Sequence, residues 1–574
     1  MPYRPAHTSL ALLFLTIVAP LYLAAMLGMV LNPWSALAVA CATVLVAFLF
    51  SHLRKETLCP SELFAMALGL ILVVQTRPRE LDSIAWDVAS YGLMKYPEMK
   101  TGVVGPYFSY GHVYEFLVSY MNELFPPLQG LSFLHSLSLF FLVVFALDYA
   151  NATRSRLSVV VCVLLLLLRD PTHMIAPELR YTAAGKSDVL LAAVILEVWA
   201  LLLKRRSSGS QALRILQFIV TNSLAAFAVG MKSSAAIALG LPMLMYWKEF
   251  IAQTVGRLSP SFYALAFSAV AWLFFCWQYL SNILIFGSPT DRALTVAGMS
   301  NSFFAVVGFS LGALAHSSPQ VAVVALALTL LLVIGLTQRA GSAVLNVRCS
   351  ALLLLLLCPW LFNGSLQRPQ FRLVLPALFL VGIDAAAVVS SFFMRLKRRL
   401  LVKRPTAERA FSTAARQVKV SLPVALCAAW SLLALVILSP QTRANYEAYF
   451  YEDYRAVYLY FTEMSPQTIY AYGLRPYFLL GRRMQHRVVY DLHPPGHLRV
   501  DPAAFAQYVA ACVSPNFLVF SDHVLGSDYF RKLLLGVEDL QVVAATEHFI
   551  VLRNAAFGQR KVAGRCPARY PMTG

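Results

Sequence analysis

Residues 76–130 read TRPRELDSIAWDVASYGLMKYPEMKTGVVGPYFSYGHVYEFLVSYMNELFPPLQG and separate two long apolar parts of the chain. Acidic and aromatic side chains recur through this segment, whereas the sequence on either side is mostly apolar as far as residue 438. Most connections between elements are short, and long ones tend to carry function. The segment therefore predicts a polar surface loop that interrupts a membrane protein.

The composition supports this class. Of 574 residues, 59% are hydrophobic and 13% are charged, and the mean hydropathy is +0.65. Soluble globular chains have about 45–50% apolar and about 25% charged residues. The net charge of +19 does not indicate nucleic acid, because the basic residues lie mostly in short segments between apolar runs, where they set topology. We expect a lipid bilayer as partner and no nucleic acid.

The apolar runs predict about 13 transmembrane helices. A span needs about 20 apolar residues, with a range of roughly 17–25. The apolar runs counted as spans, some of them shorter than this range, lie at 9–31, 34–52, 58–75, 131–150, 157–168, 187–203, 214–230, 233–247, 262–281, 319–337, 349–363, 373–393 and 420–438.

Basic residues orient these spans. With a cytoplasmic N-terminus, the inner segments hold 22 Lys and Arg residues and the longer outer ones 11, as the positive-inside rule requires. Many acidic residues lie in the outer segments, so we expect the chemistry on the outer face. The outer segments are 76–130, 169–186, 231–232, 282–302 and 364–372, followed by the region from 440.

Two domains are predicted, at 1–439 and 440–574. The first is the transmembrane part with loop 76–130. The second alternates helical runs with strand-like runs, which predicts a small soluble α/β domain; the strand-like runs are at 468–473, 486–492, 516–521 and 541–553. His486, His493 and His497 cluster there, but their spacing matches no common zinc site, and no metal site is predicted from them.

Asp87, in IAWDVASYG, is the candidate catalytic base. A carboxylate near the membrane surface accepts a proton from a hydroxyl nucleophile if it lies within hydrogen-bond reach. The alternative is that Asp87 caps a short helix, since Asp is a favoured N-cap residue.

Five cations on the same face form a candidate site for a lipid phosphate. Arg suits phosphate because its planar fork binds two oxygens at once, and a Lys before a helix N-terminus makes an anion site with the backbone N–H groups. The alternative for Lys232 is a lysine that reaches the interface from an apolar run. The five are Lys186, Lys232, Arg292, Arg368 and Arg372.

Taken in order, several stretches resemble the GT-C superfamily of membrane glycosyltransferases, which includes protein O-mannosyltransferases and the aminoarabinose transferases. The stretches are WDVASYG (86–92), YTAAGKSDVLLAAV (181–194), FAVGMKSSAAIALGLPML (227–244), YLSNILIFGSPTDR (279–292), QRPQFRLVLPALFLVG (367–382) and, in the tail, IYAYGLRPYFLLGRR (469–483).

The resemblance implies a GT-C-like transmembrane domain and an inverting transferase with a polyprenyl-phosphate-linked sugar as donor. It implies that Asp87 is the general base and that cations at the outer ends of later spans bind the donor phosphate. The acceptor would be a glycan, lipid or protein of the envelope. The protein would lie in a bacterial inner membrane, with its C-terminal domain in the periplasm.

Many members of the superfamily place paired acids at the base position, whereas Asp87 is followed by Val88. Glu98 or Asp188 would then supply the second catalytic carboxylate. If paired acids hold a metal, the cofactor would be a divalent cation, Mg²⁺ or Mn²⁺; the sequence leaves metal use open.

The sequence is also compatible with other functions. A polysaccharide polymerase or ligase with a lipid diphosphate donor would use the same outer face. A transporter would show ionisable sites at mid-membrane, but here such groups gather at one face and Glu197 is the main charged residue within a span. A receptor or structural role, with the tail as ligand-binding part, is a further alternative.

Overall fold

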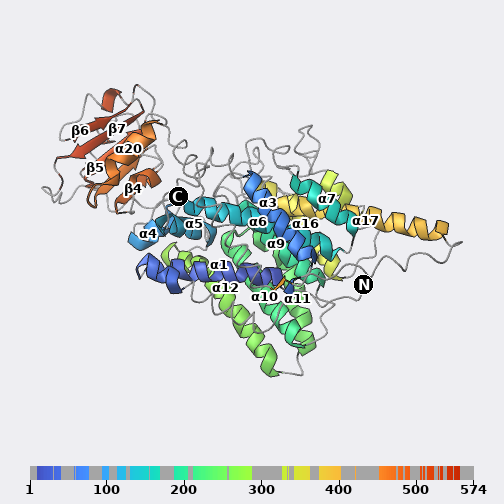
Figure 1. Cartoon of the computed structure of the whole chain (residues 1–574). Helices are drawn as coiled ribbons and strands as arrows, with labels where there is room; N and C mark the ends of the chain where they lie inside the picture. Colours follow the sequence, from blue (N-terminus) through green and yellow to red (C-terminus); the bar gives the residue numbers. More distant parts are fainter. Residues whose placement is uncertain are drawn as a thin grey trace. The chain divides into compact units, whose positions relative to one another are not determined.

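The structure is a computed structural model of the whole chain (Figure 1). It describes residues 9–29, 31–39, 57–58, 60–76, 93–101, 113–124, 129–153, 155–167, 187–204, 211–254, 258–286, 326–331, 334, 342–361, 374–401, 420–421, 452–472, 476–481, 485–491, 505–506, 509–510, 514–521, 528, 531–533, 540–546, 548–555 and 557.

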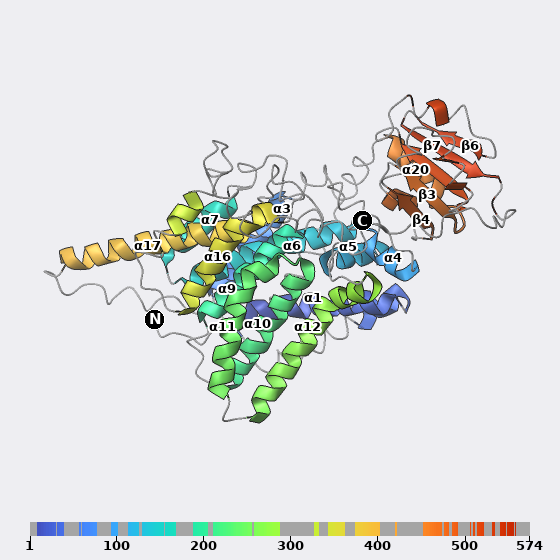
Figure 2. The same cartoon turned by 180° about the vertical axis from the view of Figure 1, so that it is seen from behind.

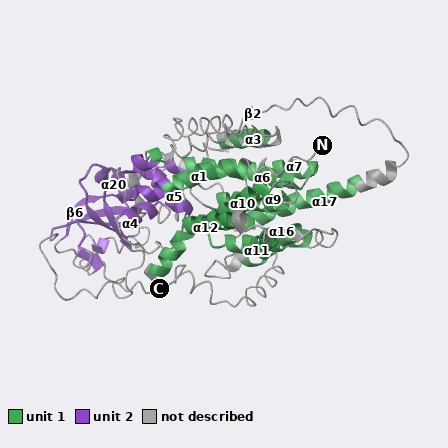
Figure 3. Ribbon diagram, turned by 90° about the horizontal axis from the view of Figure 1, so that it is seen from below, with its two compact units in different colours: residues 1–23, 38–77, 133–437 green, residues 24–37, 78–132, 438–574 purple. Residues whose placement is uncertain are grey.

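The chain forms two compact units (Figure 3). The first contains residues 1–23, 38–77 and 133–437, and the second contains residues 24–37, 78–132 and 438–574. Residues of loop 76–130 therefore belong to the same unit as the C-terminal sheet. The division at residue 440 that the sequence suggests remains a prediction.

Long apolar helices make up the first unit, and their bounds follow the apolar runs closely. The helices are α1 (Ser9–Gly28), α3 (Pro60–Thr76), α6 (Gln129–Ala152), α7 (Arg156–Leu167), α9 (Asp188–Lys204), α10 (Gln211–Met231), α11 (Ala235–Thr254), α12 (Leu258–Phe286), α16 (Ser342–Leu361) and α17 (Leu375–Leu401). The short strands β1 (Thr57–Leu58) and β2 (Val420–Ser421) pair antiparallel.

Within the described residues, six helical segments are long and apolar enough to cross a membrane, as in a multi-pass membrane protein. The expected count of 13 spans remains a prediction. The six are Leu10–Gly28, Phe133–Ala152, Gln211–Met231, Ala235–Ala252, Phe262–Leu284 and Leu375–Met394.

Helices α9, α10 and α11 alternate in direction. The Gln217 side chain, near the start of α10, donates to the carbonyl oxygen of Leu201, near the end of α9. The Trp199 indole of α9 donates to the carbonyl oxygen of Ala238 in α11. Figure 2 shows α10 and α11 beside α12, which packs on α10. The contacts fit the alternation of spans that the sequence predicts.

A buried polar network joins α6, α16 and α17. Arg348 Nε donates to Asp384 Oδ2 at 2.9 Å, and the Tyr149 hydroxyl donates to Asp384 Oδ1 at 3.1 Å. Both charged side chains are nearly buried, so each charge is compensated inside the helix bundle. Arg348, just before the expected span 349–363, lies within α16. Asp384 of α17 and Asp148 of α6 are buried acids within the helices, in addition to Glu197, which is fully buried in α9.

The second unit contains two short helices from loop 76–130, α4 (Lys95–Thr101) and α5 (Val113–Leu124). α5 is buried over nearly its whole length. Its last turn leads into α6, where Gly130 lies against the backbone of Met121 and the Leu131 N–H donates to the Asn122 side chain at 3.2 Å.

A five-stranded mixed sheet completes this unit, in the order β4-β3-β5-β7-β6. β3, β4 and β5 are parallel, and β7 is antiparallel to β5 and β6. The expected run 541–553 is two strands, because the chain turns at Thr546. The strands are β3 (Thr468–Tyr472), β4 (Arg487–Asp491), β5 (Phe517–Ser521), β6 (Leu540–Ala545) and β7 (Phe549–Asn554).

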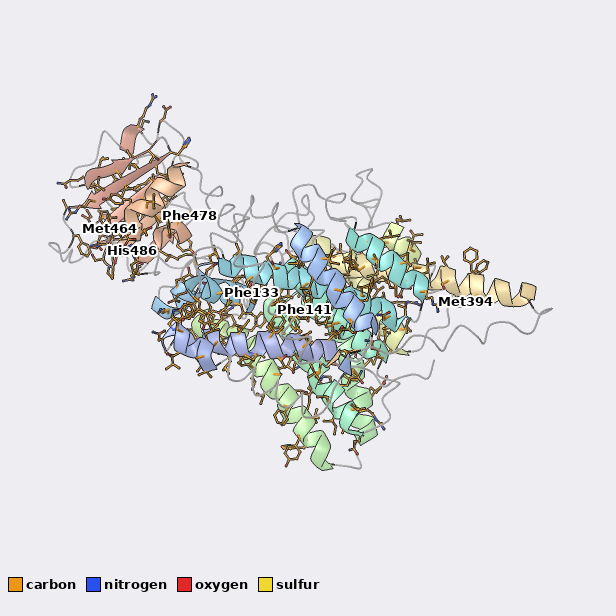
Figure 4. The ribbon with its side chains drawn as sticks, viewed as in Figure 1. Phe133, Phe141, Met394, Met464, Phe478 and His486 are labelled. Carbon is orange, nitrogen blue, oxygen red and sulfur yellow. The ribbon has the colours of Figure 1, made fainter. Side chains whose placement is uncertain are left out.

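Helix α20 (Glu452–Thr462) packs on one face of the sheet, where the Phe461 ring meets the Phe517 ring edge-on. His486 joins the two layers (Figure 4). Its Nδ1 accepts the Gln467 N–H at 3.1 Å, and its Nε2 donates to the Phe461 carbonyl oxygen at 2.7 Å. Burial lowers the pKa of this imidazole, which favours the neutral form that these two bonds require.

Candidate functional site

Three of the eight predicted site residues lie in the described part of the chain: Glu98, Asp188 and Lys232. The other five lie outside the described residues, so their roles remain predictions. These are Asp87, Lys186, Arg292, Arg368 and Arg372.

Lys232 and Asp188 form an ion pair. Lys232 Nζ lies 2.5 Å from Asp188 Oδ1. The Asp188 side chain is 2% exposed and that of Lys232 is 17% exposed, so the pair is mostly withdrawn from solvent, with the lysine at the edge. Two predicted outer segments, 169–186 and 231–232, therefore lead to the same point of the helical unit.

Local sequence explains this position. α10 ends at Met231, and the Lys232 N–H still donates to the Ala228 carbonyl oxygen. The N–H of Ala235 then donates back to the Lys232 carbonyl oxygen, so α11 begins after a very tight turn. Lys232 is thus fixed between two helices, as the absence of a loop between the apolar runs suggests.

The helix ends favour both charges of the pair. Asp188 is the first residue of α9, after Ser187, whose carbonyl oxygen accepts the Leu191 N–H. The N-terminus of a helix carries partial positive charge and its C-terminus partial negative charge. Asp188 lies at the positive end of α9, and Lys232 lies at the negative end of α10. The start of α11 lies nearby, because Lys232, which pairs with Asp188, is three residues before Ala235.

Glu98 lies in α4, in the second unit. Its side chain is buried, and Oε1 accepts the Tyr490 hydroxyl at 2.9 Å. Lys95, one turn earlier, is 1% exposed. Burial lowers the pKa of Lys95 to about 8, although the carboxylates of Glu98 and Glu115 act in the opposite direction. Loop 76–130 thus has a buried charged interior, which polar sequence alone does not reveal.

The described residues contain no group of three or more His, Cys, Asp or Glu side chains that could hold a metal ion. Asp87, the acid on which metal use would depend, lies outside them. Mg²⁺ or Mn²⁺ as cofactor therefore remains a prediction.

Two residues gain importance only from the structure. Tyr490 lies in HRVVYDL, which the sequence indicates as a strand, and the alternation of that strand places Val488 and Tyr490 on one face. Asp384 lies in an apolar run, where an acidic residue already indicates a buried charge that needs a partner. The partner of Tyr490 is Glu98 and the partner of Asp384 is Arg348. Neither pairing could be predicted from sequence, because the two members of each pair are well separated along the chain.

No family model matches the sequence, and no curated protein matches it. Among solved structures, it is similar to ArnT from Cupriavidus metallidurans bound to undecaprenyl phosphate, with 15% identity over 86% of this chain and 98% of that one and a TM-score of 0.49. Apo ArnT gives the same identity and coverage, with a TM-score of 0.47.

The oligosaccharyltransferase of Archaeoglobus fulgidus, in a complex with zinc and sulfate, is also similar. Its identity is 11%, the match covers 86% of this chain and 73% of that one, and the TM-score is 0.45.

Proposed function

We propose that the protein is an integral membrane glycosyltransferase of the GT-C type. It transfers a sugar from a polyprenyl-phosphate donor to a glycan, lipid or protein of the envelope, on the outer face of a bacterial inner membrane. The observation that carries the proposal is the contact of Lys232 with Asp188, because it brings two of the predicted outer segments together at the end of one helix bundle.

The donor phosphate binds beside the Lys232–Asp188 pair, near the start of α9. Lys232 has three N–H donors, and one is directed at Asp188. The remaining donors of Lys232, the N-terminus of α9 and the other predicted cations supply the positive charge that a phosphate requires. The other predicted cations are Lys186, Arg292, Arg368 and Arg372.

Asp87 takes the proton of the acceptor hydroxyl. The hydroxyl oxygen forms a bond to the anomeric carbon of the sugar while the bond from that carbon to the phosphate oxygen breaks. The electron pair leaves with the polyprenyl phosphate, and the configuration at the anomeric carbon inverts. Cations on the phosphate stabilise the negative charge that develops on the leaving group.

Asp188 and Glu98 remain the proposed second carboxylates. Asp188 lies beside a proposed phosphate ligand, where it also holds the lysine in place. If a divalent cation takes part, Asp87 and one of these acids would hold it, and the cation would add to the positive charge on the departing phosphate.

The test is sugar transfer by the purified protein in lipid, with a polyprenyl-phosphate-linked sugar. Asp87→Asn should reduce the rate by roughly a hundredfold or more, the usual range for a general base, with normal protein level. Asp82→Asn, five residues earlier in the same loop, is the matched control and should retain activity. Transfer at the normal rate by Asp87→Asn would remove Asp87 as the base.

The same assay tests the phosphate site. Arg372→Ala should raise the KM for the lipid donor far more than Lys403→Ala, because Lys403 is predicted to lie on the inner side. Equal effects of the two substitutions would show that the outer cations do not bind the donor.

A further inference from the structure

A buried hydrogen bond joins the C-terminal sheet to loop 76–130 within the second unit. Tyr490 lies on β4, the edge strand of the sheet, and its hydroxyl donates to Glu98 of α4 at 2.9 Å. Tyr490 is 6% exposed and Glu98 is 4% exposed. A hydrogen bond from a neutral hydroxyl to a buried carboxylate is among the stronger ones in proteins.

Alternation along β4 explains why Tyr490 is available for this contact. Val489 points to the face that packs against the core of Tyr470, Phe505 and Leu518. Successive side chains of a strand point to opposite faces, so Tyr490 belongs to the other face. Because β4 is at the edge of the sheet, the long side chain of Tyr490 can contact α4, which is not part of the sheet.

α4 is also fixed on α5, independently of the sheet. The Ser119 hydroxyl of α5 accepts the Tyr96 N–H at 2.9 Å and donates to the Leu93 carbonyl oxygen at 2.8 Å. Lys100 Nζ lies 2.5 Å from Glu123 Oε1. Removal of the Tyr490 hydroxyl therefore leaves the packing of α4 on α5 in place and removes the hydrogen bond between Tyr490 and Glu98.

The position of Glu98 favours an anchoring role. Its carboxylate is buried beside the fully buried Lys95, with Glu115 close enough to influence the same lysine. Charged groups in such a cluster hold one another in place. Asp87, the proposed base, lies only eight residues before Lys95 along the chain, so the position of α4 constrains where that segment can reach.

We propose that Tyr490 is a positioning residue: by holding Glu98, it fixes α4 against the C-terminal sheet and so sets the position of the segment that carries Asp87. The inference rests on the proposed function. It gives the sheet a part in catalysis without contact with substrate, and it gives Glu98 an anchoring role that can be distinguished from a role as a catalytic acid.

Two substitutions in the full-length protein separate these roles. Tyr490→Phe keeps the ring and removes the hydroxyl, and it should lower kcat by roughly tenfold, within the range for loss of one hydrogen bond to a charged group, while the KM for the lipid donor stays unchanged. Glu98→Gln keeps an oxygen that can accept the Tyr490 hydroxyl, so amide exchange in residues 95–101 should stay close to that of the wild type. Tyr460→Phe, on α20, is the matched control and should have normal kcat.

Amide hydrogen exchange of the same proteins in lipid supplies a readout that does not depend on activity. Tyr490→Phe should accelerate exchange in residues 95–101 by about tenfold or more, with exchange in β3 and β5 unchanged. If the wild-type protein transfers no sugar, the proposed function fails, whereas faster exchange in α4 still supports the anchor.

Three results would overturn the inference. The rate of amide exchange in α4 could be the same in Tyr490→Phe and in the wild type, which would show that the Tyr490–Glu98 hydrogen bond does not stabilise the position of α4. Tyr490→Phe could leave kcat unchanged in an active enzyme. Glu98→Gln could abolish transfer while Tyr490→Phe does not, which would assign Glu98 to the reaction itself.

Discussion

At the scale of single residues, the Lys232–Asp188 pair combines a structural and a proposed functional role. The aspartate is almost fully buried, whereas the lysine is at the edge. A buried carboxylate is costly unless a cation and hydrogen bonds compensate it. Lys232 therefore compensates part of the charge of Asp188, and its other N–H groups are those proposed to bind the donor phosphate.

Lys232→Met should lower the free energy of unfolding by about 3 kcal/mol, the lower end of the range for a broken buried pair. The double variant Lys232→Met/Asp188→Asn should lose less than the sum of the two single variants, because both substitutions break the same ion pair. Thermal unfolding of the purified wild-type protein, the two single variants and the double variant measures these differences.

The pair Lys100–Glu123 gives a second cycle in which the cation is more exposed: the Lys100 side chain is 42% exposed and the Glu123 side chain is 9% exposed. Lys100→Met should therefore lower the free energy of unfolding by less than Lys232→Met does. Additive effects of Lys232→Met and Asp188→Asn would contradict the coupling.

Sequence predicts the chemistry of single residues better than their contacts. Lys232 stands out because it lies between two apolar runs, and Asp188 because it precedes one. Their contact forms because the start of α9 and the turn between α10 and α11 lie at the same end of the helix bundle. That placement depends on how α9, α10 and α11 pack together, which the local sequence does not show. For Tyr490 and Glu98, no local pattern connects two residues that are far apart in the chain.

At the scale of elements, apolar runs predict the long helices well. α10 (Gln211–Met231) and α17 (Leu375–Leu401) match expected spans within a few residues at most ends, and α17 continues beyond its apolar run into the basic segment. α4 and α5 were not expected, because their sequences are polar and aromatic and their burial comes from tertiary packing. The split of 541–553 into two strands was missed because its turn contains no Gly or Pro.

Gly130, in the first turn of α6, allows the close packing of α6 on α5. A Cβ at this position would lie 2.4 Å from the Met121 carbonyl carbon and 2.5 Å from its oxygen. Backbone atoms within a buried helix cannot move aside easily. Gly130→Ala should therefore lower the free energy of unfolding by about 1–3 kcal/mol, as other overpacking substitutions do, measured by thermal unfolding.

Gly240 in α11 is the matched control. A Cβ there would have no heavy atom within 4 Å, and Ala favours a helix over Gly by about 1 kcal/mol. Gly240→Ala should be neutral or stabilising. Equal destabilisation by both substitutions would show that the α5–α6 contact is not what requires glycine at 130.

At the scale of the whole molecule, the ion pairs mark two ends of the helical unit. Lys232 and Asp188 pair at the start of α9, whereas Lys204, the last residue of α9, pairs with Asp148 near the end of α6. The 17 residues of α9 correspond to about 25 Å at 1.5 Å per residue, close to the thickness of a bilayer's hydrocarbon core. The structure thus provides two charged ends, and the basic residues of the sequence predict which one faces outward.

Labelling with a membrane-impermeant maleimide in intact cells tests that orientation. Ser288→Cys, just after α12, should react from outside, because residues 282–302 are predicted to follow an outward span. Ser208→Cys, between α9 and α10, should react only after the cells are permeabilised, since three basic residues at 204–206 hold that segment inside. The unsubstituted protein, labelled in parallel, corrects for its nine native cysteines. The reverse pattern would place Lys232 and Asp188 at the cytoplasmic surface, and a sugar donor would then have to be used on that side.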